Sequence, residues 1–220
     1  MSPRLTSIYG TLAVADASAP PELLSAHAYA LGWAQAVARA AGDDPASAAY
    51  FDTMALELSR VAWTVIEAGS VNYDQTAREV APAEIVSALL DAGSGDASTA
   101  RVDRLFAAAA SRTPPAGLAN LLGFWWAQSA HFGGTSMAVG PVEIDGRGGM
   151  STSIVWLDFA YASNGWGSLF VKRRADRLDV SARRLKRAFA PALWAAAGPG
   201  VEARLRDQAE KFIRTLTLDL

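Results

Sequence analysis

The 220-residue chain holds few side chains with the chemistry of a catalytic or metal-binding site. It has no cysteine, which excludes disulfides, thiolate metal ligands and cysteine nucleophiles. Its two histidines, His27 and His131, belong to no HxH, HExxH or HxxxH arrangement, so no metal site or cofactor is predicted. No convincing serine-nucleophile motif is present either. The sequence alone therefore does not identify a function.

His131 is the best single candidate for acid–base chemistry, because only histidine titrates near neutral pH without perturbation. Glu143 and Asp158, both within the predicted sheet, are its candidate partners. This trio would make the protein an enzyme or a carrier with an apolar small-molecule pocket. A buried ion pair of Asp158 with Arg173 is the favoured alternative for that carboxylate. Overall, the sequence favours a non-enzymatic protein.

Two other groups of residues have structural interpretations. His27 lies on the apolar stripe of the first helix, where a core histidine with satisfied nitrogens is expected. Gly146, Gly148 and Gly149 surround Arg147 but join two predicted strands. A phosphate cradle needs its glycines between a strand and a helix N-terminus, so these glycines predict a hairpin loop.

Charge is distributed unevenly along the chain, although the net charge is only −2. The segment from 172 to the end has 12 basic and 6 acidic residues, whereas the preceding part has 8 basic and 16 acidic. This asymmetry predicts an anionic partner, either a membrane surface or an acidic protein. Packing of the basic segment against the acidic half of the same chain is the competing interpretation. The candidate binding cations are Lys172, Arg173, Arg174, Arg177, Arg183, Arg184, Lys186 and Arg187.

Aromatic residues are concentrated in the second half of the chain. Three consecutive aromatics on one helix cannot share a narrow face, so that helix is buried all round or one face contacts a partner. Nucleic acid is a weak candidate partner, because the pI is about 5.7 and no binding module is visible. Exposed aromatics would instead suit a membrane interface or a homo-oligomer. The candidate binding tryptophans are Trp125, Trp126, Trp156 and Trp166.

Hydrophobic periodicity predicts a helical first half. Residues 1–19 are poorly periodic, and Leu5 to Val14 fits an edge strand or coil. Proline, N-cap and glycine signals then delimit a series of helices. These helices are predicted at about 21–41, 45–68, 82–92, 98–112 and 116–132.

The period then changes to two, which predicts strands at 137–145 and 151–161. Asn164-Gly165 predicts a tight hairpin with a returning strand from Trp166 to Val171. In that register Phe159 lies opposite Phe170, and Trp156 lies opposite Arg173. Helices are expected at about 179–189, with a strand as the alternative near its start, and at 191–197 and 201–216.

The predicted fold class is α+β, as a single domain over 1–220. A helical half at about 20–132 packs on a short antiparallel sheet of about three strands near 137–171, and basic helices follow at about 172–220. Neither a signal peptide nor a membrane span is predicted, since the richest apolar stretch, 117–132, is interrupted by polar residues. We expect a cytoplasmic protein, or one exported without a recognisable signal. The preferred function is a binding, membrane-active or toxin-like protein that engages an anionic partner through the basic segment and the aromatic hairpin.

Overall fold

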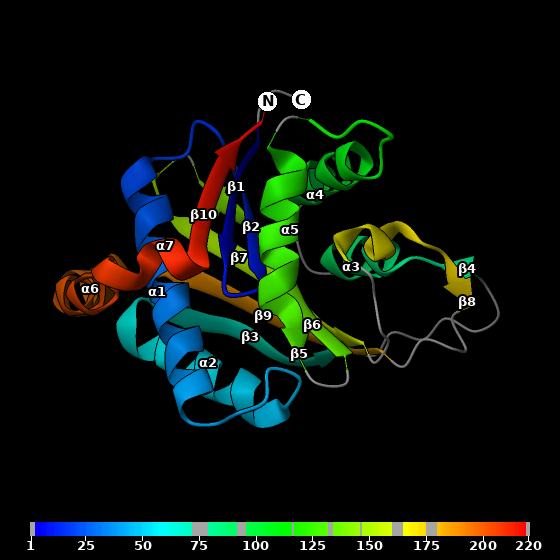
Figure 1. Ribbon diagram of the computed structural model, residues 1–220. Helices are drawn as coiled ribbons and strands as arrows, with labels where there is room; N and C mark the ends of the chain where they lie inside the picture. Colours follow the sequence, from blue (N-terminus) through cyan, green and yellow to red (C-terminus); the bar gives the residue numbers. More distant parts are fainter. Residues whose placement is uncertain are drawn as a thin grey trace.

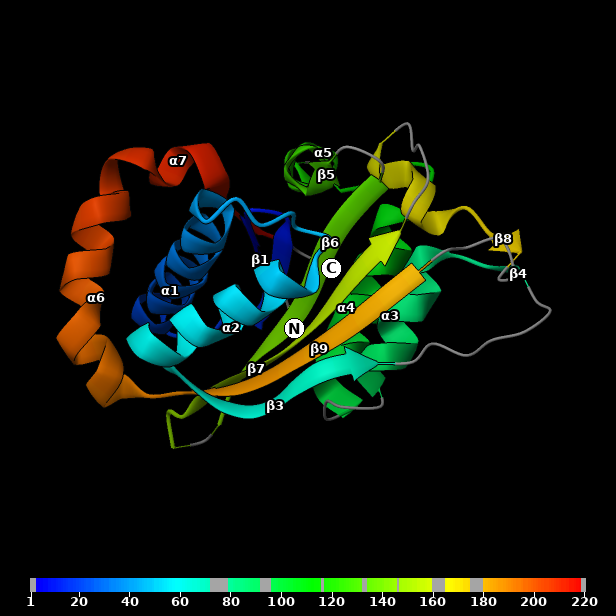
Figure 2. The same cartoon turned by 90° about the horizontal axis from the view of Figure 1, so that it is seen from below.

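A mixed β-sheet with helices on both faces forms the centre of the protein (Figures 1 and 2). The computed structural model describes residues 3–71, 79–91, 96–115, 117–131, 134–145, 147–159, 165–174 and 180–218. Within these ranges the strand order is β10-β1-β2-β6-β7-β9-β3, with β5 beside β6. The strands of this sheet are β1 (Pro3–Ile8), β2 (Thr11–Asp16), β3 (Trp63–Val71), β5 (Ala130–His131), β6 (Gly134–Ile144), β7 (Met150–Phe159), β9 (Val180–Phe189) and β10 (Ile213–Thr217). A separate two-stranded ladder joins β4 (Glu79–Val80) to β8 (Arg173–Arg174).

β2 and β6 are parallel neighbours in a sheet whose other described pairings are antiparallel. β1 turns into β2 at Tyr9 and Gly10, both of which have positive φ. The carbonyl oxygen of Gly10 accepts hydrogen bonds from the Trp125 indole at 2.8 Å and from the Ala138 amide at 2.9 Å. The turn is thereby fixed against both the sheet and a helix, and this sets the position where β2 runs beside β6.

Four helices share a core with one face of the sheet (Figure 2). α1 begins with a proline in its first turn and carries Glu22 near its start and Arg39 near its end, which suits the helix dipole. The Ser47 hydroxyl caps α2 by accepting from the Tyr50 amide at 3.0 Å. The four are α1 (Pro21–Ala40), α2 (Ala48–Val61), α6 (Pro191–Leu205) and α7 (Ala209–Phe212), with a short 3-10 turn, η3 (Arg206–Gln208), between the last two.

The opposite face packs against α3 (Pro82–Asp91), α4 (Asp96–Ala109) and α5 (Leu118–Ser129). Ile85, Leu105 and Leu122 are buried in this second core, together with sheet residues such as Val14 and Val155. Alternate residues of each strand therefore enter alternate cores, as the pleat requires. The molecule has three layers, with the sheet in the middle.

This architecture contradicts the predicted α+β fold of a helical half on a three-stranded sheet. The sheet is larger than expected, and it takes strands from both ends of the chain. The N-terminal stretch forms β1 and β2, both of which are interior strands rather than an edge strand or coil. Nearly every residue of these strands is buried, whichever face of the sheet it points to. The strands therefore lack the polar alternation that marks a half-exposed strand.

The predicted hairpin of Trp156 and Phe159 with Phe170 and Arg173 is also wrong. Residues 166–170 form a 3-10 helix, η1 (Trp166–Phe170), instead of a returning strand. Trp156 pairs with Ala138 and Arg183, while Phe159 pairs with Thr135 and Val180. Asn164 lies outside the described residues, whereas Gly165 precedes η1 with φ of 123°. The antiparallel partner that residues 151–159 require is supplied by β9, and this leaves η1 outside the sheet.

The basic segment was predicted as a helix, but residues 180–189 form the strand β9. Ala182, Leu185 and Phe189 have helical spacing, yet Leu185 and Ala182 enter opposite cores. α6 also runs straight through Gly198-Pro199-Gly200, where a break was expected. The predicted final helix ends early, because residues 213–217 form β10 beside β1.

The second predicted helix ends at Val61, not near 68, because Trp63 starts β3. β3 pairs antiparallel with β9, and its register shifts between Val65 and Glu67. By contrast, the helices predicted at 21–41, 82–92, 98–112 and 116–132 correspond to α1, α3, α4 and α5, and the strands at 137–145 and 151–161 to β6 and β7. The glycine-rich stretch around Arg147 lies between β6 and β7, as expected for a hairpin loop.

Candidate functional site

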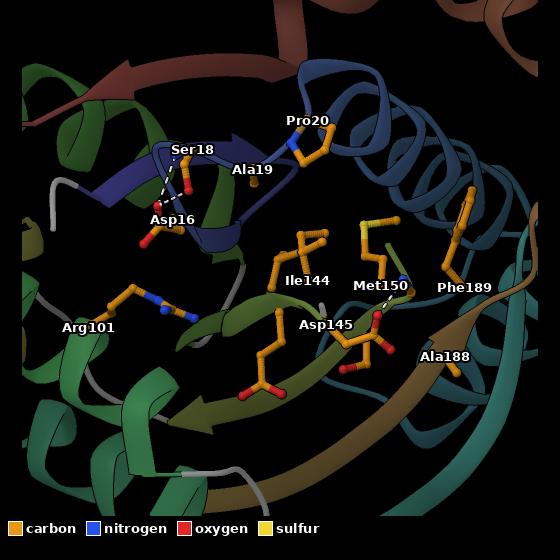
Figure 3. A pocket seen from close by; sticks show the side chains of 14 residues that line it. Asp16, Ser18, Ala19, Pro20, Arg101, Ile144, Asp145, Met150, Ala188 and Phe189 are labelled. Atoms are coloured by element: carbon orange, nitrogen blue, oxygen red, sulfur yellow. Dashed lines mark hydrogen bonds between the residues drawn. The ribbon is translucent and has the colours of Figure 1, made fainter. Parts of the chain in front are cut away.

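A cavity of about 680 Å³ opens at the end of the sheet where the parallel strands β2 and β6 finish (Figure 3). The carboxyl ends of neighbouring parallel strands are a common place for ligand binding in sheets with helices on both faces. The cavity volume lies within the range of about 300–1,000 Å³ that is typical of small-molecule pockets. This makes it the leading candidate site in the described part of the chain.

The floor of the cavity is a row of residues that crosses four strands. The β2–β6 pairing ends with Val14 opposite Pro141, and Asp16 and Glu143 each follow the last paired residue of their strand by two positions. Glu143 pairs with Ser151 on β7, and Ser151 pairs with Ala188 on β9. All four line the cavity. Asp16 and Glu143 therefore lie near the ends of two neighbouring strands, β2 and β6.

The carboxylates of Asp16 and Glu143 lie on the face of the sheet that packs against α4. Val14 is part of the core on that side. Asp16 follows it by two residues along the strand, so its side chain points to the same face. Ser151 occupies the same alternation as Val155 of that core, and Glu143 is its direct partner. The row thus presents two acids and a hydroxyl to the cavity beneath α4.

Asp16 is held in its ionised form by the residues that follow it. Its Oδ1 accepts hydrogen bonds from the Ser18 hydroxyl at 2.6 Å and from the Ser18 amide at 2.9 Å (Figure 3). These bonds, the side-chain bond foremost, lower the pKa of Asp16, and the nearby charge of Arg101 lowers it further. Oδ2 is shielded from solvent and makes no hydrogen bond to the described residues. Asp16 therefore offers an ionised oxygen without a protein donor.

Arg101 reaches the cavity from α4, and in Figure 3 its side chain lies on the same side as Asp16, with Asp145 opposite. Its charge acts on Asp16, yet no ion pair within 4.0 Å joins these two described residues. Its Nε is shielded from solvent and donates to no described acceptor. The cavity is thus bordered by opposite charges that do not contact one another.

Asp145 lies at the rim and shapes the β6–β7 turn. Its Oδ1 accepts from the Arg147 amide at 2.8 Å and from the Gly149 amide at 2.7 Å. These two backbone hydrogen bonds, that of Gly149 first, lower the pKa of Asp145. A Cβ at Gly149 would lie 2.6 Å from Asp145 Oδ2, so a larger residue there would force this carboxylate to move. The turn is preorganised, with a third negative charge at the cavity mouth.

The remaining wall of the cavity is largely apolar. Ile144, Met150 and Phe189 line it together with Ala19 and Pro20 (Figure 3). The described ionisable lining therefore consists of three carboxylates, Asp16, Glu143 and Asp145, against one guanidinium, Arg101. An apolar wall beside an excess of negative charge suits a ligand with an apolar body and a positive group. Across the described ranges, no three histidine or acidic side chains converge in a way that could hold a metal ion.

The sequence-based trio of His131, Asp158 and Glu143 is not brought together in one place. Asp158 pairs with Ser136, whereas Glu143 pairs with Ser151 near the other end of β7. Seven residues along a strand span about 23 Å, which separates the two carboxylates. His131 pairs with Gly134, near the Asp158 end. Glu143 lines the cavity, whereas Asp158 does not.

Most described cations of the basic segment make contacts within the chain. Arg183 donates to the Ser47 carbonyl at 2.7 Å and lies over the Phe51 ring. Arg184 forms an ion pair with Glu67, and Lys172 forms one with Glu84 at 3.3 Å. These pairs agree with the competing interpretation of the sequence, in which the basic segment packs against the acidic half of the same chain.

The other members of that segment differ in exposure. Arg187 is buried and donates to the Ser59 hydroxyl and the Ala55 carbonyl, both at 2.7 Å. Arg173 and Arg174 are exposed in β8, and Lys186 is half-buried in β9. Arg177 lies outside the described residues.

The candidate tryptophans are mostly core residues. Trp125, Trp126 and Trp156 are buried, and the Trp156 indole donates to the Ser136 hydroxyl at 2.5 Å. Trp166 is half-buried, in edge-to-face contact with Phe170. The exposed large apolar side chains of the described ranges are aliphatic: Leu56, Val65, Ile66, Val171 and Leu193.

His27 is buried as expected, but its nitrogens are not satisfied. Neither ring nitrogen has a hydrogen-bond partner among the described residues, and burial lowers the pKa of His27 to about 4. It lies in a packed core rather than in the cavity. The cavity residues that sequence reasoning missed are Asp16, Arg101, Asp145 as a site residue, and Ser151. Asp145 and Glu143 share a strand face in the sequence pattern, but nothing in the sequence pointed to Asp16 or Arg101.

Within the described ranges, no helix is both long enough and apolar enough to cross a bilayer. No protein-family model matches this chain, and no curated protein matches it in sequence.

Proposed function

We propose that this protein binds a small molecule that carries a positive charge on an apolar body, in the cavity at the ends of β2 and β6. One observation carries this proposal: Asp16 and Glu143 project from neighbouring strands into a cavity of about 680 Å³. Two carboxylates that line one cavity attract a cation and disfavour an anion.

The arrangement of donors and acceptors supports an amine as the positive group. An ammonium has three N–H donors and can bridge several acceptor oxygens at once. Asp16, Glu143 and Ser151 all line the cavity, and each carries side-chain oxygen that can accept a hydrogen bond. Ile144, Met150 and Phe189 then offer apolar contact for the rest of the ligand.

Isothermal titration with matched ligands tests this function directly. Tryptamine, its neutral alcohol analogue tryptophol and the anionic indole-3-acetate differ mainly in charge, and a parallel set on a phenyl ring varies the apolar body. We expect the amines to bind at least tenfold more tightly than the neutral analogues, and the acids to bind least. Equal binding of amine and alcohol would refute selection by charge.

Two variants locate the binding to the cavity. Asp16→Asn and Glu143→Gln keep side-chain size and remove one negative charge each, so each is expected to weaken amine binding about tenfold, the usual scale for loss of a charge-assisted hydrogen bond. Asp207→Asn, an exposed carboxylate on η3, serves as the matched control and should leave affinity unchanged. If all three variants bind alike, the ligand does not use this cavity.

The exposure of Val171 to Arg174 favours a second candidate function, the binding of an anionic surface. An apolar residue followed by three cations is a combination that suits an anionic membrane interface. Co-sedimentation at low salt with vesicles of phosphatidylglycerol or of phosphatidylcholine tests it, with binding expected to the anionic vesicles alone. The triple variant Lys172→Gln, Arg173→Gln, Arg174→Gln should abolish that binding, whereas Arg206→Gln on the exposed η3 should not. Equal recovery with both vesicle types would remove this function.

A further inference from the structure

The unpaired opposite charges at the cavity contain more information than its overall negative character. Arg101 is close enough to influence Asp16, yet the two side chains do not form an ion pair. Asp16 Oδ2 and Arg101 Nε are both shielded from solvent and lack partners among the described residues. A carboxylate and a guanidinium thus line the same cavity without an ion pair between these two described residues.

From this geometry we infer that the ligand is a zwitterion of the α-amino-acid type, with its ammonium at Asp16 and Glu143 and its carboxylate at Arg101. This inference rests on the proposed function and names the ligand class of the same cavity. An α-amino acid carries its two charges on neighbouring groups, so one small molecule can contact both a cation and an anion that do not pair with each other. The guanidinium fork matches the two oxygens of a carboxylate.

The charge balance of the described lining favours a carboxylate over a phosphate as the anionic group. Arg101 is the single cation among the described lining residues, against Asp16, Glu143 and Asp145. One guanidinium neutralises one negative charge. A phosphate monoester brings about 1.5 to 2 negative charges at neutral pH, and the excess would face three carboxylates.

The apolar wall assigns a place to the amino-acid side chain. Ile144, Met150 and Phe189 line the cavity from the alternate positions of the strand ends, which belong to the opposite core, and Ala188 ends the polar row with a small side chain. A ligand whose charged end is fixed between Asp16 and Arg101 can therefore rest an apolar side chain on this wall. The expected ligands are amino acids with apolar or aromatic side chains, or short peptides that present the same two groups.

Matched pairs that differ only by the carboxylate test the inference. The probes are tryptophan and tryptamine, phenylalanine and phenethylamine, and leucine and isoamylamine, titrated into the full chain at neutral pH. We expect at least one amino acid to bind tenfold or more tightly than its decarboxylated partner. If the amines bind as tightly as their amino acids, the inference fails while the proposed function stands. If none of the six binds, both fail.

Variants of Arg101 assign the preference to that side chain. Arg101→Met should remove the preference for the amino acid and tighten amine binding, because a repelling positive charge is gone. Arg101→Lys keeps the charge without the fork and should retain part of the preference. Arg104→Met is the matched control on the same helix, since the exposed Arg104 donates to the Ala100 carbonyl at 3.2 Å and does not line the cavity. An unchanged preference in Arg101→Met, with a native far-ultraviolet spectrum, would overturn the assignment.

Discussion

The imidazole of His27 meets the indole of Trp63 edge-on, with their ring centroids 5.2 Å apart. Both side chains are buried, and neither His27 nitrogen nor Trp63 Nε1 has a hydrogen-bond partner among the described residues. A protonated imidazole in this setting would be a buried charge without a counter-ion. The contact between α1 and the start of β3 therefore depends on a neutral histidine.

Stability should fall on acidification because of His27. Burial lowers its pKa from 6.5 to about 4 in the folded protein, so the unfolded chain binds this proton more readily. The loss begins as the pH drops below about 6.5, is complete below about 4, and amounts to about 2 kcal/mol between pH 7 and pH 5. Urea unfolding across this pH range measures it. His27→Leu should flatten the dependence, and an unchanged slope in that variant would exclude His27 as its source.

Arg187 should be more sensitive to replacement than any exposed cation of the same strand segment. Its guanidinium donates to Ser59 on α2 and to the Ala55 carbonyl, and burial lowers its pKa to about 10. Lysine has one ammonium and cannot reproduce both bonds, so Arg187→Lys should cost about 1–3 kcal/mol of unfolding free energy. Guanidinium chloride unfolding tests this, with Arg206→Lys as an exposed control. Equal midpoints for the two variants would show that the buried bonds do not contribute.

Replacement by alanine should change the stability of the fold in opposite directions at Gly140 and Gly123. A Cβ at Gly140 would lie 2.7 Å from Ile154 Cγ1, between β6 and β7, whereas a Cβ at Gly123 on α5 meets nothing within 4 Å. Gly140→Ala should destabilise the fold by about 1–3 kcal/mol through overpacking. Gly123→Ala should stabilise it by about 0.5–1 kcal/mol through helix propensity. Thermal unfolding of both variants is the measurement, and a shift in the same direction would contradict the packing at Gly140.

Removal of the Ser18 hydroxyl should affect one carboxylate of the cavity and not its neighbour. The Ser18 side chain is the main cause of the lowered pKa of Asp16, so Ser18→Ala should raise that pKa. The stability that ionised Asp16 contributes is present above its unfolded pKa and is lost as the pH falls through its folded pKa, so in the variant the loss should be smaller and should be complete at a higher pH. Carbon-detected NMR titration follows Asp16 directly. Asp145 is the internal control, since its acceptor oxygen is bound by backbone amides.

The helix that the sequence marks most clearly at its ends, α1, was predicted closely. The proline in its first turn and the glycine shortly after its last residue are local signals, and local signals do not depend on the rest of the fold. β9 was assigned wrongly because Ala182, Leu185 and Phe189 fit helical spacing. Its hydrogen bonds to β3 and β7 decide its conformation, and those partners lie far away along the chain.

Glu143 was found from sequence as an acid on a predicted strand, but Asp16 and Arg101 were not. Their place beside Glu143 depends on the parallel pairing of β2 with β6 and on the packing of α4 across the sheet. Neither the strand pairing nor the helix packing produces a periodic pattern in the sequence. The site could not be predicted because its members are chemically ordinary until the fold brings them together.

The parallel contact between β2 and β6 has a thermodynamic consequence for any ligand of the cavity. Asp16 and Glu143 are separated by 127 positions in the chain, with the helices α1 to α5 and the strands β3 to β5 between them. No partly folded state that lacks this pairing can offer both carboxylates to the same molecule. Binding therefore stabilises the complete native state. A ligand at one hundred times its Kd would add about 2.7 kcal/mol to the global free energy of unfolding. Slow hydrogen exchange across the whole sheet, rather than local ordering of a loop, would be the mark of an occupied site.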